Sequence, residues 1–134
     1  MFRKIKIESR INNLRIVEKA IDEATSEVGI SQDNYGKILV STLEAVNNAI
    51  LHGNNSNPEK FVEIEINFNS NELKIKVTDE GSGFRPEEVP DPTIPENVEM
   101  VNGRGVFIMS RLADKIRYSK KGNKVTMTFK NVKA

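Results

Sequence analysis

The sequence predicts an α+β protein, a two-layer α/β sandwich with a mixed, mainly antiparallel sheet and helices on one face. Three observations predict this class. Five short segments alternate apolar and polar residues, as half-buried strands do. Two long segments repeat apolar residues every three or four positions, as amphipathic helices do. Short turns join neighbouring strand segments, which favours antiparallel pairing, and helices on one face of such a sheet make an economical two-layer fold.

The composition fits a single domain over residues 1–134. Hydrophobic residues make up 37% and charged residues 29% of the chain, and the net charge is +1. This balance predicts neither a nucleic acid nor an anionic membrane as a direct partner. The absence of cysteine excludes disulfides and thiol catalysis and is consistent with a cytoplasmic location. The start has no signal-peptide core, and no run approaches the roughly 18–20 apolar residues of a membrane span.

The first two elements are a strand and a helix. Residues Phe2–Glu8 alternate and predict the strand, after which Ser9 is expected to cap a helix. Apolar residues then recur at three- and four-residue steps from Arg10 to Val28. Gly29 is expected to end that helix, because glycine adopts the left-handed conformation found at helix C-termini.

The second helix is expected to start at Ser31 and to end at Gly53. Its segment Leu39–Gly53 is apolar on almost every side, which predicts a helix buried on most faces. Glu44, Asn48 and His52 nevertheless recur at four-residue intervals along one face. Polar groups in a buried helix cost free energy unless a partner satisfies them. Either this face is the solvent-exposed side of a half-exposed helix, or a ligand with a metal ion covers it. His52 is most simply a helix-end residue with local hydrogen bonds.

The second half of the chain begins with a dense turn signal over residues 52–58, which is expected to be a loop, and continues with a hairpin. An irregular segment with four prolines follows over residues 85–102, and connections of that length are usually functional or disordered. Phe61, Phe68 and Phe129 are expected to be core residues. The remaining expected elements are strands Phe61–Phe68, Leu73–Val77, Lys115–Ser119 and Lys124–Lys130, and a helix Val106–Ala113.

Two glycine-containing segments are candidates for ligand binding. Asp79, Gly81 and Gly83 lie at a strand end, where the glycines let the backbone approach a flat ligand and the carboxylate could accept a hydrogen bond from an amino group such as that of adenine. The segment 103–105 opens a helix, where free N–H groups and an arginine could bind an anion. Each segment could also be an ordinary turn. Neither a Walker motif nor a dinucleotide-binding fingerprint is present.

These segments resemble the three motifs of the GHKL ATPase/kinase superfamily, which has the Bergerat ATP-binding fold. EAVNNAILHG (Glu44–Gly53) resembles its N box, DEGSGF (Asp79–Phe84) its first glycine box and GRGVFIM (Gly103–Met109) its second. Residues 85–102 fall where this family has its ATP lid. The short chain and the form of the N box most resemble the bacterial anti-sigma-factor serine/threonine kinases.

The resemblance implies a role for each motif residue. Glu44 would be the general base, Asn48 would hold Mg²⁺ on the ATP phosphates, and Asp79 would bind the adenine amino group. The resemblance also implies a serine/threonine kinase that phosphorylates an anti-sigma-factor antagonist and sequesters a sigma factor, with a homodimer possible. The remaining nucleotide-binding residues would be Gly81 and Gly83 near the adenine, and Gly103, Arg104, Gly105 and Val106 near the phosphates.

One departure from the family pattern leaves an alternative open. Family members often have a threonine directly after the glycine of the final turn, near the nucleotide. Here Gly122 is followed by Asn123 and Lys124. The alternative function is therefore an ATP-binding regulatory interaction module without kinase activity.

Overall fold

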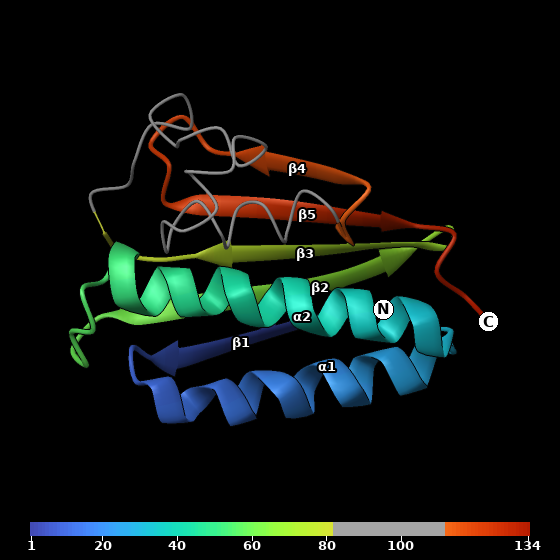
Figure 1. Ribbon diagram of the computed structural model, residues 1–134, viewed down its shortest axis with the longest axis horizontal. Helices are drawn as coiled ribbons and strands as arrows, with labels where there is room; N and C mark the ends of the chain where they lie inside the picture. Colours follow the sequence, from blue (N-terminus) through green and yellow to red (C-terminus); the bar gives the residue numbers. More distant parts are fainter. Residues whose placement is uncertain (82–111) are drawn as a thin grey trace, which may run out of the picture.

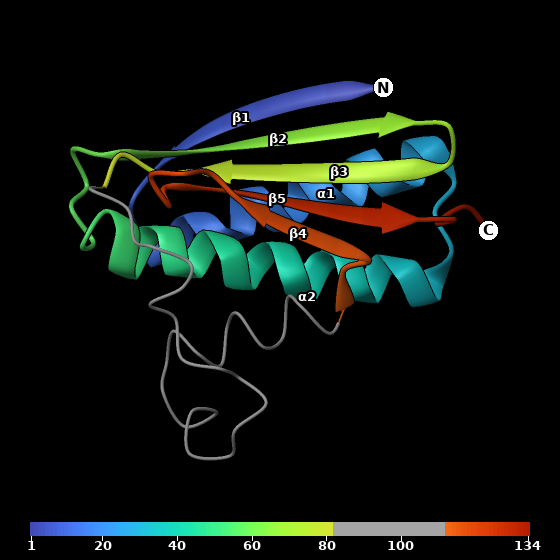
Figure 2. The ribbon, with the colours of Figure 1, turned by 90° about the horizontal axis from the view of Figure 1, so that it is seen from above.

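A computed structural model describes residues 1–81 and 112–134 of the chain. Their five strands form one sheet in the order β1-β2-β3-β5-β4, and both long helices cover the same face of it (Figures 1 and 2). This two-layer arrangement confirms the predicted fold class. The elements are β1 (Phe2–Glu8), η1 (Ile11–Asn13), α1 (Leu14–Val28), α2 (Gln32–Asn48), η2 (Ala49–Gly53), β2 (Phe61–Asn69), β3 (Glu72–Thr78), β4 (Lys115–Tyr118) and β5 (Lys124–Lys130).

The sheet is antiparallel in all four of the strand pairings within residues 1–81 and 112–134. Its register places apolar residues opposite one another, with Ile64 opposite Val77, and Ile75 between Ile66 and Met127. Because successive side chains in a strand point to opposite faces, this register collects the apolar side chains on the face that the helices cover. These side chains and the inner faces of α1 and α2 form the core.

The β2–β3 hairpin has a two-residue turn. Ser70 and Asn71 both have positive φ, 52° and 59°. This combination is that of a turn whose twist matches antiparallel strands, and asparagine tolerates it better than most residues do. The hairpin predicted from the sequence is therefore confirmed.

The predicted helix ends are confirmed at two positions and wrong at a third. Gly29 ends α1 with φ 73°, and the Ser31 side chain caps α2 by accepting a hydrogen bond from the backbone N–H of Asn34. Ser9 does not cap the first helix, because its hydroxyl donates instead to the backbone carbonyl of Lys60, 2.8 Å away. The sequence pattern showed a polar residue before a helix but not the loop that comes to lie beside it.

Two expectations about burial also need correction. Val40, within the apolar segment of α2, is 45% exposed, so that helix is less completely covered than its composition predicts. Phe129 is a core residue and Phe68 packs against the core, as predicted. Phe61 is only half-buried, and its ring lies 4.8 Å from the ammonium group of Lys6. Phe61 has the opposite strand parity to Ile64, which places it on the other face of the sheet.

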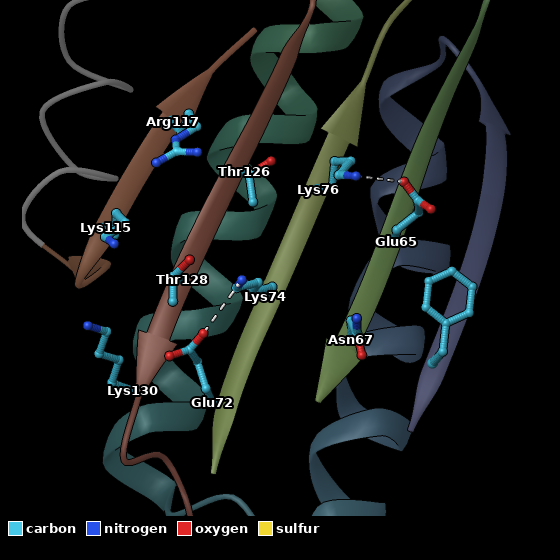
Figure 3. A pocket seen from close by; sticks show the side chains of 11 residues that line it. Glu65, Asn67, Glu72, Lys74, Lys76, Lys115, Arg117, Thr126, Thr128 and Lys130 are labelled. Carbon is cyan, nitrogen blue, oxygen red and sulfur yellow. Dashed lines mark ion pairs between the residues drawn. The ribbon is translucent and has the colours of Figure 1, made fainter. Parts of the chain in front are cut away.

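The outer face of the sheet is a charged surface. A shallow hollow of about 380 Å³ lies on it, lined mainly by β3, β4 and β5 (Figure 3). Lys74 pairs with Glu72 and Lys76 with Glu65 across this face. The helices lie behind the sheet in Figure 3, so the hollow is on the opposite face of the sheet from α2, which carries Glu44 and Asn48. Within the described ranges, no helix has the length and apolar character needed to cross a bilayer.

Candidate functional site

Three segments meet at one end of the sheet: the end of α2, the end of β3 and the β4–β5 turn (Figure 1). After Asn48 the helix continues as the π-helical turn η2, in which the N–H of Asn54 donates to the carbonyl of Ala49 at 2.8 Å. Such wider turns are frequent at functional sites. This turn brings the end of the helical segment into contact with the residues that follow β3.

Gly53 and Gly81 are in close contact with each other and with Asp79. A Cβ atom built on Gly53 would lie 2.3 Å from Oδ2 of Asp79, and one built on Gly81 would lie 1.9 Å from the carbonyl oxygen of Gly53. Real Cβ atoms do not come that close to other heavy atoms. At Gly81 the obstructing atoms are backbone atoms, so glycine is needed there for the packing of the protein itself, whereas a side chain at position 53 would displace the Asp79 carboxylate. Gly81 was predicted to permit close approach of a ligand; the structure shows that it permits close approach of η2.

The Asp79 carboxylate is held in a fixed position beside Gly53. Its Oδ1 accepts a hydrogen bond from the backbone N–H of Gly81 at 2.8 Å. Burial raises the pKa of Asp79, while the Gly81 hydrogen bond and the charges of Lys121 and Lys60 act in the opposite direction. Its Oδ2 accepts no hydrogen bond from residues 1–81 or 112–134, so it is free to accept one from an amino group of a ligand.

Asn54 is a site residue that the sequence did not reveal. It is completely buried. Its Oδ1 accepts from the N–H of Glu80 at 2.8 Å, and its Nδ2 donates to the hydroxyl of Ser9 at 2.8 Å and to the carbonyl of Phe61 at 3.0 Å. The side chain thus ties the Asp79 segment to the end of β1 and the start of β2. In the sequence Asn54 is one of several polar residues in a loop, and nothing distinguishes it from its neighbours.

Asn123, the residue at which the chain departs from the family pattern, contacts Asp79. The N–H of Asp79 donates to the carbonyl of Asn123 at 2.9 Å, and Nδ2 of Asn123 donates back to the carbonyl of Asp79 at 3.1 Å. The hydroxyl of Ser119 donates to Oδ1 of Asn123 at 3.3 Å. The asparagine side chain therefore holds the main chain of the first glycine motif.

Glu44 and Asn48 lie on α2, upstream of this contact. Both side chains are half-buried, and neither has a hydrogen bond or an ion pair with residues 1–81 or 112–134. Asn48 is the last residue of α2, directly before the π-helical turn that ends at Gly53. His52 lies in the π-helical turn η2 and is exposed. The roles of Glu44 and Asn48 stay predictions.

The other predicted site residues lie outside the described ranges. These are Gly83, the lid segment 85–102, and Gly103, Arg104, Gly105 and Val106; the predicted helix Val106–Ala113 falls almost entirely outside as well. Their roles stay predictions.

The chain is similar in sequence to bacterial regulators along most of its length. It is 26% identical to the anti-sigma F factor of Geobacillus kaustophilus over 127 residues, which are 93% of this chain and 87% of that protein. It is 26% identical to the serine-protein kinase RsbW of Listeria innocua over 110 residues, 77% of this chain and 70% of that protein. The anti-sigma F factor of Clostridium botulinum is 26% identical over 131 residues, 86% and 90% of the two chains.

The fold has a counterpart among solved structures. The structure of the RsbU and RsbW domains of Rv1364c from Mycobacterium tuberculosis superposes with a TM-score of 0.71 at 17% sequence identity, and the match covers 97% of this chain and 32% of that one. That likeness shows a shared fold. The model of the histidine kinase-like ATPase domain matches residues 7–129. Because that match spans nearly the whole chain, the protein belongs to the histidine kinase-like ATPase domain family.

Proposed function

We propose that this chain is an ATP-dependent serine/threonine protein kinase that acts as an anti-sigma factor. It would phosphorylate an anti-sigma-factor antagonist and sequester a sigma factor. The observation that carries the proposal is the contact between Asp79 and Gly53, because it joins the first glycine motif to the helix that bears Glu44 and Asn48. The names of the relatives, anti-sigma F factor and serine-protein kinase, support this role at the level of the family.

The surroundings of Asp79 are suited to binding the adenine ring of a nucleotide. The free Oδ2 of Asp79 is an acceptor for the adenine amino group. Its position is fixed before binding, since Gly53 supports one side of the carboxylate and Gly81 donates to the other oxygen. A fixed acceptor binds a matching donor without the loss of side-chain freedom that a mobile one would suffer. Gly83 would add a second position without a side chain near the base.

Two residues of α2, Asn48 and Glu44, are suited to roles at the phosphates of the same nucleotide. Bound ATP supplies the phosphoryl group, and Mg²⁺ neutralises charge on its phosphates. Asn48 would hold the Mg²⁺, because hard cations prefer oxygen ligands and its amide oxygen has no partner in the described ranges. Glu44 would accept the proton from the hydroxyl of the acceptor serine or threonine at its carboxylate, and it is unpaired and half-buried one turn earlier on the same helix face.

Residues outside the described ranges complete the proposal. The arginine and the free N–H groups of the second glycine motif would contact the phosphates, and residues 85–102 would cover the nucleotide as a lid. The motif residues are Gly103, Arg104, Gly105 and Val106. We further propose that the protein works in the cytoplasm and as a homodimer.

The direct test is phosphate transfer from labelled ATP to the antagonist protein of the same organism. Removing a general base typically lowers a rate by about 10²–10⁴-fold, so Glu44→Ala is expected to transfer phosphate at that reduced rate while it still binds ATP. Glu18→Ala, on the exposed face of α1, is the matched control and is expected to behave like the wild type. A wild-type protein that binds ATP and antagonist but transfers no phosphate would favour the alternative, an ATP-binding interaction module without kinase activity.

A further inference from the structure

Four main-chain polar groups of the Asp79–Gly81 turn form hydrogen bonds with described residues. The N–H and the carbonyl of Asp79 both bond to Asn123, at 2.9 and 3.1 Å. The N–H of Glu80 bonds to Oδ1 of Asn54, and the N–H of Gly81 bonds to the Asp79 carboxylate, each at 2.8 Å. A turn at a strand end is usually held by few contacts, and each of these bonds removes freedom from the chain.

The two asparagines hold the turn from different parts of the fold. Asn123 belongs to the β4–β5 turn, and its own orientation is set by the hydroxyl of Ser119. Asn54 follows η2 and is fixed by two donated hydrogen bonds in a fully buried position. The turn therefore lies between two polar side chains that cannot move independently of the sheet and the helix.

This arrangement leaves one oxygen of Asp79 for a ligand. Oδ1 is occupied by the Gly81 N–H, and Oδ2 lies beside Gly53 with no hydrogen bond from the described residues. Adenine has an amino donor at the ring position where guanine has a carbonyl acceptor. A rigid acceptor therefore favours adenine and opposes guanine, whereas an acceptor that can move away opposes guanine less.

We propose that Asn54 and Asn123 are positioning residues that clamp the Asp79–Gly81 turn and thereby set the preference for adenine over guanine nucleotides. The proposal rests on the proposed function, in which Asp79 receives the adenine amino group. It also assigns a role to the departure at position 123. In this chain that side chain acts on the nucleotide through the main chain of Asp79.

The test variant is Asn123→Asp. This change keeps the size of the side chain, the backbone hydrogen bond with Asp79 and the oxygen that accepts from Ser119, and it replaces the Nδ2 donor to the Asp79 carbonyl with a charged oxygen. Asn71→Asp is the matched control, because Asn71 uses only its Oδ1, which accepts from the N–H of Lys133 at the opposite end of the sheet. Asn123→Ala and Asn54→Ala are companion variants that add no charge.

Two readouts separate positioning from a general loss of stability. The first is amide hydrogen exchange of Asp79, Glu80 and Gly81 in the nucleotide-free protein, measured by NMR. The second is the ratio of ATP to GTP affinity, measured by calorimetry. A misplacement of about 1 Å can cost up to 100-fold in activity, so a loss of roughly tenfold or more in the ATP-to-GTP ratio is expected for Asn123→Asp. An added charge that only repels phosphates would lower both affinities and leave the ratio unchanged.

The outcomes separate the two proposals. Faster exchange at the three amides together with a lower ATP-to-GTP ratio, in folded variants, supports the clamp. Unchanged exchange, or faster exchange with an unchanged ratio, overturns it. A wild-type protein that binds neither nucleotide overturns the proposed function, and the preference for adenine falls with it. A wild type that binds ATP and GTP equally leaves nucleotide binding intact and overturns only the clamp.

Discussion

The carboxylate of Asp79 lies against the α-carbon of Gly53, so closely that no side chain fits between them. Asp79 follows β3, and Gly53 ends the helical segment that begins at α2. Two segments separated by 25 residues of sequence therefore share one surface, and each determines the position of the other. This contact places the predicted adenine acceptor at the end of the helix that carries the predicted catalytic and metal-binding residues.

Gly53→Ala should weaken ATP binding without unfolding the protein. The new Cβ would overlap the Asp79 carboxylate, which is the end of a side chain and can rotate away. Rotation breaks the hydrogen bond from Gly81 and removes the acceptor from its place, a change worth about 1–3 kcal/mol of binding free energy. Calorimetric titration with ATP measures the loss.

Gly36→Ala is the matched control for that variant. Gly36 lies within α2, and a methyl group added there would meet no atom within 4 Å, so alanine fits at this position. Alanine in a helix interior is more favourable than glycine by roughly 0.5–1 kcal/mol, and Gly36→Ala should raise the melting temperature and leave ATP affinity unchanged. Equal ATP affinity in Gly53→Ala and Gly36→Ala would contradict the proposed role of the Asp79–Gly53 contact.

Asp79→Asn should bind ATP more weakly and yet be at least as stable as the wild type at neutral pH. The folded-state pKa of Asp79 is raised above its ordinary value of 3.8, chiefly by burial, so the folded state binds this proton more tightly than the unfolded state does. The charged carboxylate therefore costs stability above the folded pKa, and that cost disappears as the pH falls below the unfolded pKa. Asparagine carries no such cost.

Melting curves of the wild type and of Asp79→Asn, measured at several pH values, test this direction of the pH dependence. The stability advantage of Asp79→Asn should be largest near neutral pH and should shrink as the pH falls toward 3.8. An asparagine whose Oδ1 keeps the Gly81 hydrogen bond would place its NH₂ group at the position of Oδ2, where it opposes the adenine amino group. A variant less stable than the wild type at neutral pH, or one that binds ATP normally, would be inconsistent with this account.

Asn48→Ala should remove the dependence of nucleotide binding on Mg²⁺. The amide oxygen of Asn48 is the proposed protein ligand of the ion, and alanine keeps the helix while removing that oxygen. Loss of one group that stabilises charge in a transition state typically lowers the rate by about 10²–10³-fold, and a reduction of this size in phosphate transfer is expected.

ATP titrations with and without Mg²⁺ give the readout for Asn48. The wild type should bind ATP more tightly with Mg²⁺, and the variant should show little difference between the two conditions. Asn12→Ala, on the exposed surface of η1, is a control that should retain the wild-type response. An unchanged Mg²⁺ effect in Asn48→Ala would remove Asn48 from the metal site.

The sequence predicted the elements well because their signals are local. Alternation placed β2 and β5 close to their observed bounds, and Ser31 and Gly29 mark helix ends through contacts within a few residues. Ser9 was misassigned because its partner, Lys60, lies 51 residues away. Local patterns cannot reveal such a partner.

The site was predicted in part for the same reason. The motifs pointed to Asp79 and Gly81, and the structure places both beside the end of α2. The motifs did not point to Asn54, whose three hydrogen bonds reach Ser9 after β1, the first residue of β2 and the turn after β3. A buried polar network depends on the three-dimensional arrangement, and an asparagine in a polar loop carries no sign of it in the sequence.

Calorimetric titration of the wild type and of Asp79→Ala with ATP, in the presence of Mg²⁺, measures whether the Asp79 carboxylate holds the nucleotide. We expect one ATP to bind per wild-type chain and Asp79→Ala, while still folded, to lose most of that affinity. An ATP affinity that is the same in the two proteins, or a folded wild-type protein that binds no ATP, would contradict this expectation.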